Sequence, residues 1–331
     1  MNSFGQLFRV NIFGESHGES VGILIDGCPA GLSLGPEDLL ADIERRKGGQ
    51  QPGTTPRIEE DLPNFKSGLF QGKTTGAPLL ICFDNKNTRS SDYEKQRSIP
   101  RPGHADFVAA KKFGGFEDYR GSGHFSGRLT LPLVAAGAIA KKLLGSVQIA
   151  ATLTEVGGYA DIEKGIAYAI AQKDSVGGIV ECRVSGLAVG LGEPFFDATE
   201  SLLAHAVFAV PAIRGIEFGT GCAAARLLGS QHNDAIEDAK GTTRSNHAGG
   251  IVGGLTNGNE LVFRVAVKPT SSTPQEQRSL NTSSGQQEEF VIKGRHDLCI
   301  ALRVPVVIEA VTALVLADLL LREQHIKRVL F

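Results

Sequence analysis

Glycine is unusually frequent in this chain, and its distribution constrains the fold more than any other feature. It accounts for 41 of the 331 residues, about 12% against a usual level of about 7%. The glycines follow no repeat, which excludes a low-complexity chain, and gather at 48–49, 121–127 and 249–258. Because glycine lets the backbone approach a ligand or another strand closely, these patches predict functional loops between regular elements.

Short apolar runs rich in β-branched residues predict strands. They lie at 21–25, 79–83, 178–184 and 260–267, and each ends in Gly, Pro or Asn. The chain therefore contains buried β-structure in both halves.

Three stretches with helical spacing predict helices. Residues 36–46 begin with Pro and acidic residues and end in Arg-Arg, which suits both ends of a helix dipole. Residues 130–144 and 305–323 are rich in Ala, Val and Leu and predict core helices. The most apolar stretch, 304–321, contains Glu309 and ends in charged residues, so a buried helix is expected rather than a membrane span.

An internal similarity links residues 23–43 with residues 182–207. Each runs from a strand through Gly and a Gly-Leu pair to an acidic turn and a helix. This predicts two related α/β halves, roughly 1–150 and 151–331, in one unit spanning 1–331, with chance similarity as the alternative. No long polar linker divides them, and we expect the polar segments 47–57, 85–102 and 269–287 to be loops over a site.

Charge and cysteine content exclude several classes of protein. The 34 Lys and Arg nearly balance the 36 Asp and Glu, so no basic field is available to hold nucleic acid or an anionic membrane. Arg-Gly patches could still bind nucleic acid, but only four Tyr and no Trp are present for stacking on bases. The five cysteines are odd in number and form no CxxC pair, which predicts reduced core thiols in a cytoplasmic protein rather than disulfides or a zinc site.

Two loops place histidine beside glycine. FGESHG at 13–18 presents Ser16 and His17, although an ordinary loop histidine is the alternative. RPGHAD at 101–106 is a turn that should bring Arg101 and His104 together.

Three further motifs indicate an anion site. RGSGHFSGR at 120–128 precedes a predicted helix, so free backbone N–H groups flanked by arginines could bind an anion, unless this is only a connector with solvated arginines. The segment SNHAGG at 245–250 is too rich in glycine for a helix and carries no dinucleotide fingerprint. GRHD at 294–297 could bind an anion and move a proton, with a surface ion pair as the alternative.

Together with KPTSS at 268–272, these ordered motifs resemble the chorismate synthase family, and the likeness extends from 5–8 to 317–318. The resemblance implies an α+β fold: a compact β-α-β sandwich with an internal pseudo-two-fold repeat and helices packed between and against antiparallel sheets. It also implies a homotetramer with one flavin site per subunit.

The implied reaction is the anti 1,4-elimination of phosphate from 5-enolpyruvylshikimate 3-phosphate to give chorismate, which completes the shikimate pathway toward aromatic amino acids. Family members use noncovalently bound reduced FMN and regain it unaltered. The chain has no nicotinamide fingerprint and no room for a reductase region, so a separate NADPH-dependent flavin reductase is expected to supply reduced FMN.

The resemblance also assigns roles to residues, and no metal is expected. Arg45 and Lys47 would be neighbours of the substrate. His17 would act at the leaving phosphate, His104 would balance the charge of the flavin ring, and Asp297 would relay a proton at flavin N5. The substrate contacts would be Ser16, Arg46, Arg57, Arg101, Arg128 and Arg295, and the flavin contacts Ser126, Asn246, Lys268, Thr270, Ser271 and Ser272.

One stretch departs from the family pattern. The family commonly carries Arg and Glu where this chain has His124 and Leu129, so we expect no essential role at 124 while Arg128 keeps its own. The alternative function is a flavin-independent lyase or transferase that acts on a phosphorylated sugar acid with the same Arg and His residues.

Overall fold

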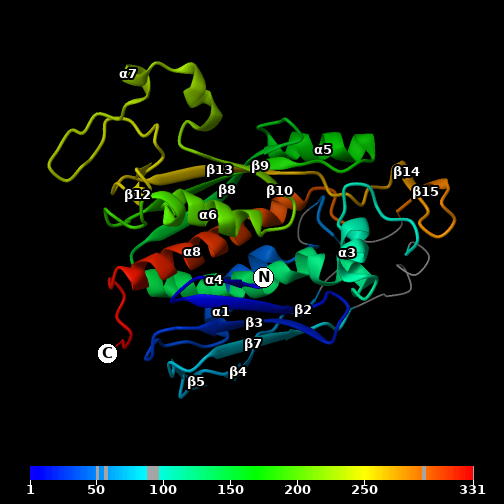
Figure 1. The fold of residues 1–331 in the computed structure, drawn as a ribbon, viewed down its shortest axis with the longest axis horizontal. Coiled ribbons are helices and arrows are strands. Elements are labelled where there is room, and N and C mark those ends of the chain that lie inside the picture. Colours follow the sequence, from blue (N-terminus) through cyan, green and yellow to red (C-terminus); the bar gives the residue numbers. More distant parts are fainter. Residues whose placement is uncertain (50–51, 56–58, 88–96, 293–295, 331) are drawn as a thin grey trace.

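Two antiparallel sheets enclose a layer of helices (Figure 1). The computed structural model describes residues 1–49, 52–55, 59–87, 97–292 and 296–330. The first sheet contains, in spatial order, β1 (Ser3–Phe4), β2 (Arg9–Gly14), β3 (Ser20–Asp26), β7 (Leu79–Asp84) and β4 (Asn64–Ser67). The second contains β10 (Ile213–Phe218), β13 (Leu261–Val267), β9 (Gly178–Ser185) and β8 (Gln148–Val156).

The two sheets share one topology. Four strands of the first sheet, β2, β3, β4 and β7, correspond in chain order to β8, β9, β10 and β13 of the second. Across the first sheet their spatial order is β2-β3-β7-β4. Across the second it is β8-β9-β13-β10, which is the same order of corresponding strands. The matched strands β3 and β9 are each followed by a helix, α1 (Glu37–Arg46) and α6 (Thr199–Phe208). The predicted fold class with its internal repeat is therefore confirmed, whereas the division of 1–331 into halves near residue 150 stays a prediction.

The helix layer is centred on α4 (Thr130–Leu144) and α8 (Val304–Arg322). Gly137 permits their close contact, because a Cβ built on Gly137 would lie 2.3 Å from the Cβ of Ala310. Nearly all of α8 is buried, as expected for a helix that is apolar on every side. By length and composition it could cross a membrane, but its burial between the sheets makes it a core helix.

Two carboxylates on α8 bind the first half of the chain. The Glu309 carboxylate accepts bonds of 2.7 Å from both Arg45 and Lys141. Burial alone would raise the pKa of Glu309, but the bonds from Arg45 and Lys141 outweigh burial, so the pKa of Glu309 is lowered overall. Asp318 accepts backbone bonds of 2.7 Å from Leu7 and 2.8 Å from Phe8. Hydrogen bonds of this kind offset the cost of burying the two carboxylates in the core.

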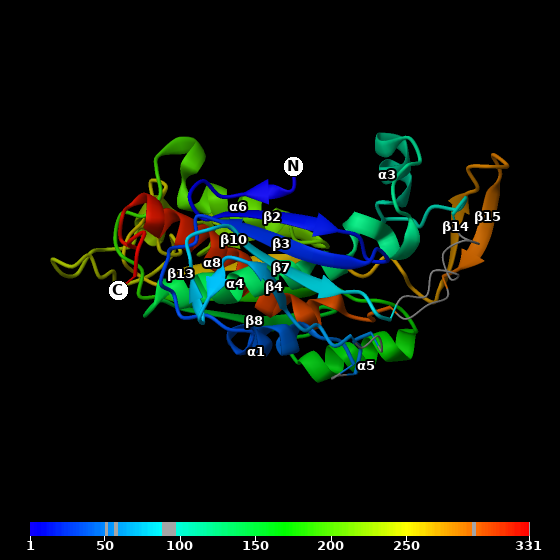
Figure 2. The ribbon, with the colours of Figure 1, turned by 90° about the horizontal axis from the view of Figure 1, so that it is seen from below.

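Smaller helices, turns and two-stranded pairs lie around the two main sheets. Figure 2 places α3 and the β14–β15 hairpin at the same end. The additional helices are α3 (Asp106–Phe113), α5 (Ile162–Gln172) and α7 (Gly229–His232). The 3-10 turns are η1 (Arg120–Phe125), η2 (Gly127–Leu129), η3 (Phe195–Asp197), η4 (Gly221–Arg226) and η5 (Ile300–Arg303). The two-stranded pairs are β5 (Leu69–Phe70) with β6 (Lys73–Thr74), β11 (Ile251–Val252) with β12 (Leu255–Thr256), and β14 (Glu276–Leu280) with β15 (Gln287–Val291).

The structure corrects two expectations. Residues 269–287 are not only loop, because β14 pairs with β15 over five residues from each strand. The cysteines are free, but not all of them are core thiols: Cys222 is exposed and Cys82 only half-buried. Burial raises the pKa of the Cys28 and Cys182 thiols to about 12, as expected for inert core cysteines.

Candidate active site

A cavity of about 560 Å³ opens where corresponding parts of the two halves meet. Its walls include the end of α1 and the turn η2 before α4 from the first half. The second half contributes the segment after α6 and the turn η5 before α8. This volume is within the range of sites for small ligands and cofactors.

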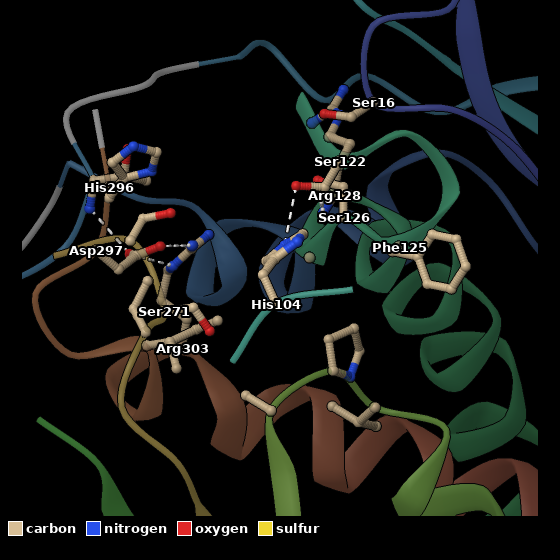
Figure 3. Close-up of a pocket in the computed structure, with 18 of the residues that line it drawn as sticks. Ser16, His104, Ser122, Phe125, Ser126, Arg128, Ser271, His296, Asp297 and Arg303 are labelled. Atoms are coloured by element: carbon tan, nitrogen blue, oxygen red, sulfur yellow. Dashed lines mark hydrogen bonds and ion pairs between the residues drawn. The ribbon is translucent and has the colours of Figure 1, made fainter. Parts of the chain in front are cut away.

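The cavity brings most of the predicted site residues together. Figure 3 shows Ser16, Ser122, Ser126 and Arg128 on one side, Ser271, Asp297 and Arg303 on the other, and His104 between them. Arg57 and Arg295 lie outside the described residues. The predicted residues that line the cavity are Ser16, Arg46, Arg101, His104, Ser126, Arg128, Lys268, Thr270, Ser271, Ser272 and Asp297.

Arg46 and Arg128 share one buried counter-ion, Asp61. Arg128 Nη1 donates to Asp61 Oδ1, and Arg46 Nη1 lies 3.7 Å from Asp61 Oδ2. Arg46 Nε also donates to Thr130 Oγ1 at 2.9 Å. Burial first, and then the charge of Arg303, lower the pKa of Arg46 to about 9. These contacts fix two guanidinium groups in place and leave them only partly neutralised.

Arg303 and Asp297 form a second ion pair in the cavity wall. Arg303 donates from Nε to Asp297 Oδ1 at 3.0 Å and from Nη2 to Asp297 Oδ2. The backbone N–H of Thr55 also donates to Asp297 Oδ1, at 3.0 Å. Asp297 is therefore held in one orientation by partners from two separate segments. Arg303 is a cavity residue that the sequence analysis missed.

Arg101 and His104 lie close together, as the RPGHAD turn predicts. Arg101 Nη2 is 3.1 Å from His104 Nδ1, and Arg101 Nε donates to Asp106 Oδ2 at 2.7 Å. Arg101 Nη1 also donates to Ser272 Oγ, at 3.1 Å. This arginine thus joins the turn at 101–106 to the KPTSS segment.

The KPTSS segment carries a cation and hydroxyl groups. Lys268 Nζ donates to Ser271 Oγ at 2.7 Å, and burial and the charge of Arg214 lower the pKa of Lys268. The buried hydroxyl of Thr270 has no hydrogen-bond partner within the part of the chain that the structure describes. A buried hydroxyl without a partner on a cavity wall is suited to a ligand.

Two of the expected site residues, His17 and Asn246, do not line this cavity. His17 is buried behind Gly121: a Cβ on Gly121 would come within 2.3 Å of the His17 ring, and Gly121 has a φ of +57°. His17 is not among the described lining residues. Asn246 is also absent from that lining, because its amide spans the glycine-rich segment, donating to Glu260 O at 2.7 Å and accepting from Gly250 N at 2.8 Å. Its predicted flavin contact is not seen within this cavity.

The arginines of the RGSGHFSGR segment point in different directions. Arg128 lines the cavity, whereas Arg120 pairs with Asp118 at 2.8 Å, away from the cavity lining. The prediction of an anion site with an arginine on each side is therefore wrong for Arg120. At the end of α1, Lys47 lines the cavity and Arg45 points to Glu309.

Positive charge dominates the described lining. It contains seven Lys or Arg side chains and three carboxylates, from Glu59, Asp61 and Asp297. An apolar wall at 208–213 faces this charged region of the same cavity. A ligand with several anionic groups and an apolar ring system would match such a surface.

Comparisons with known proteins show the family of the chain. The family model described as chorismate synthase matches residues 8–321. A chorismate synthase of Chitinophaga pinensis is 69% identical, and one of Dehalococcoides mccartyi is 45% identical; each alignment covers 99% of both chains. A crystal structure of chorismate synthase has the same fold, with a TM-score of 0.73 at 24% identity over 97% of this chain and 93% of that one. The chain belongs to the chorismate synthase family.

Proposed function

We propose that this chain eliminates phosphate from 5-enolpyruvylshikimate 3-phosphate in the anti 1,4 sense to give chorismate, with reduced FMN as a catalyst that is not consumed. It would act as a lyase in aromatic biosynthesis. The observation that carries this proposal is the excess of fixed cations over carboxylates in one cavity. The substrate has two carboxylates and a phosphate, which need several cations held in advance.

The substrate contacts follow from the cavity wall. Arg46 and Arg128, held by Asp61, would bind anionic groups of the substrate, together with Ser16 and Arg101. Arg57 and Arg295 remain proposed contacts on the family resemblance alone. His17 would act on the leaving phosphate through a shift of the glycine segment at 121, since it is covered there.

The cavity fits the flavin that the family implies. Lys268, Thr270, Ser271, Ser272 and Ser126 would hold it by hydrogen bonds, and the apolar wall at 208–213 would face its ring. When bound, reduced FMN supplies electron density that makes breaking an unactivated C–H bond accessible. His104 would balance its charge, and Asp297, oriented by Arg303, would move a proton at the ring. Asn246 would take part through the glycine-rich segment that it organises.

The remaining properties follow from the family resemblance. The chain would assemble as a homotetramer in the cytoplasm and depend on a separate NADPH-dependent flavin reductase. Three buried free cysteines are consistent with a reducing compartment.

A spectroscopic experiment tests the cofactor assignment. The purified protein is mixed with FMN, reduced with dithionite without oxygen, and titrated with substrate. We expect the reduced-flavin spectrum to change in proportion to bound substrate. An unchanged spectrum with phosphate still released would instead favour a flavin-independent lyase.

A further inference from the structure

His104 is held at both ring nitrogens by side chains from different segments. His104 Nδ1 lies 2.6 Å from Asp106 Oδ1. Its Nε2 lies 3.2 Å from Ser122 Oγ (Figure 3). Asp106 begins α3 and Ser122 belongs to η1. The carboxylate, imidazole and hydroxyl thus form a continuous chain of hydrogen bonds.

The partners determine where the hydrogens lie. Burial alone would raise the pKa of Asp106, but hydrogen bonds from Arg101 and His104 outweigh burial and lower that pKa, so the carboxylate is an acceptor. Arg101 Nη2 also lies 3.1 Å from His104 Nδ1, but its two hydrogens have closer acceptors in Asp106 Oδ1 at 2.8 Å and Ser122 Oγ at 3.0 Å. Nδ1 therefore donates to Asp106, which is 2.6 Å away. Arg101 Nη2 donates to Ser122 Oγ at 3.0 Å, which leaves the Ser122 hydrogen for another acceptor. In neutral His104 that acceptor is Nε2.

The backbone of Ser122 is in an unfavourable conformation. Its φ is +71° and its ψ is 9°. Glycine adopts this left-handed conformation without steric strain, whereas a residue with a Cβ is strained in it. Its neighbours in the segment, Gly121 and Gly123, also have positive φ. Glycine would suit position 122 better for folding alone, so the hydroxyl is the feature that the serine adds.

Ser122 and His104 also lie in a wall between two cavities. Both residues line the candidate active site and a second cavity of about 630 Å³ on the far side of the turn at 101–106. Asp106 lines only the second cavity. The chain of hydrogen bonds therefore runs from Asp106 in the second cavity to Ser122 in the wall that both cavities share.

We propose that Ser122 is a positioning residue that holds His104 by Nε2, while Asp106 holds Nδ1. Together they fix the ring as the Nδ1–H tautomer and keep it from turning in the wall. The effect on catalysis rests on the proposed function, in which His104 balances the charge of the flavin ring.

The variant Ser122→Gly tests this without straining the backbone. Since glycine tolerates the left-handed conformation, relief of backbone strain should offset the loss of the two Ser122 hydrogen bonds, and the melting temperature of the variant should stay close to that of the wild type. Ser283→Ala is the matched control, because Ser283 lines only the second cavity of the two. Nitrogen NMR of histidine-labelled protein, with the His104 signals assigned from a His104→Gln variant, gives the readout.

In the wild type, neutral His104 should show a protonated Nδ1 and a hydrogen-bonded, unprotonated Nε2. In Ser122→Gly only the Nε2 signal should move, toward that of a free ring nitrogen, and kcat should fall roughly two- to tenfold, as expected for one lost hydrogen bond. Ser283→Ala should change neither.

An unchanged Nε2 signal in Ser122→Gly, or a wild-type ring protonated at Nε2 alone, would overturn the proposal. A moved signal with unchanged kcat would overturn its catalytic part. The NMR measurement needs no turnover, so a failure of the proposed function would appear separately, as inactive wild-type enzyme.

Discussion

The carboxylate of Asp61 is paired with the guanidinium of Arg128 inside the protein, where their side chains are only 2% and 5% exposed. Arg46, whose side chain is 7% exposed, lies against the other oxygen of the same carboxylate. Asp61 is therefore the shared counter-ion of two buried arginines in the cavity wall.

Replacing Asp61 by Asn should strongly destabilise the protein. Breaking a buried pair leaves uncompensated charge and typically costs about 3–5 kcal/mol, and Asn tolerates the positive φ of position 61. Urea unfolding at pH 7 measures the change in the free energy of unfolding. Added sulfate should recover more stability in the variant than in the wild type.

Asp118→Asn is the matched control for Asp61→Asn. Asp118 pairs with Arg120, whose side chain is 41% exposed, so this change should cost no more than about 1 kcal/mol. Similar losses in the two variants would contradict the special role of Asp61.

Substrate binding should depend much more on Arg128 than on His124. Arg128→Ala removes a charge-assisted contact of roughly 1.5–3 kcal/mol, which weakens affinity about ten- to a hundredfold. His124 instead contacts Gly14 O at 2.8 Å and Asn2 Oδ1 at 3.2 Å, so His124→Ala should weaken affinity far less. Calorimetric titration of each folded variant makes the comparison, and equal losses would show that the anion contact is misassigned.

Affinity for the substrate should fall as pH rises above about 9. Burial and the charge of Arg303 lower the pKa of Arg46 to about 9. An anionic ligand is attracted only by the protonated guanidinium. The attraction between Arg46 and the substrate is therefore complete well below pH 9 and is lost above it. Above pH 9 the unfolded chain still holds the Arg46 proton that the folded chain has lost. The free energy of unfolding contributed by Arg46 therefore rises with pH in this range, while the affinity for substrate falls.

Titrations between pH 7 and 10 test this dependence. Above pH 9, deprotonation of Arg46 should lower the affinity for substrate by at most about tenfold per pH unit. Arg46→Gln should bind more weakly at pH 7 and lose less affinity on going to pH 10, with Lys268 still able to titrate. An identical pH dependence in the variant would exclude Arg46 as its cause.

Substitutions at Thr270 and Asn246 should affect different properties: the first should weaken FMN binding, and the second should lower the stability of the fold. Thr270→Val removes a hydroxyl that has no hydrogen-bond partner among the described residues, so it should weaken FMN binding about two- to tenfold with little loss of stability. Asn246→Ala removes two bonds that hold the glycine-rich segment and should destabilise the protein by roughly 1–3 kcal/mol. Flavin fluorescence and urea unfolding give the two values, and the reverse pattern would refute the assignment.

Local sequence patterns predicted the regular elements well. The stretch 130–144 coincides with α4, and the run at 260–267 with β13, because apolar spacing and β-branched residues report burial directly. The hairpin β14–β15 was missed because its residues are largely polar and its strands are defined by pairing with each other.

The motifs predicted the site less completely. Arg303 follows an ordinary apolar stretch, and its importance arises only when η5 meets the first half in the folded chain. Asp61 likewise gains its role from arginines 15 residues before it and 67 after it. Asn246 lies in a recognisable motif, but a motif does not reveal whether a side chain faces the cavity or braces a loop.

The most direct test is an anaerobic assay with purified enzyme, reduced FMN and 5-enolpyruvylshikimate 3-phosphate, in which phosphate and chorismate are measured together. We predict equal amounts of both products, many turnovers per flavin, and no turnover with oxidised FMN in air without a reductant. Phosphate release without flavin, or phosphate without chorismate, would contradict the proposed function.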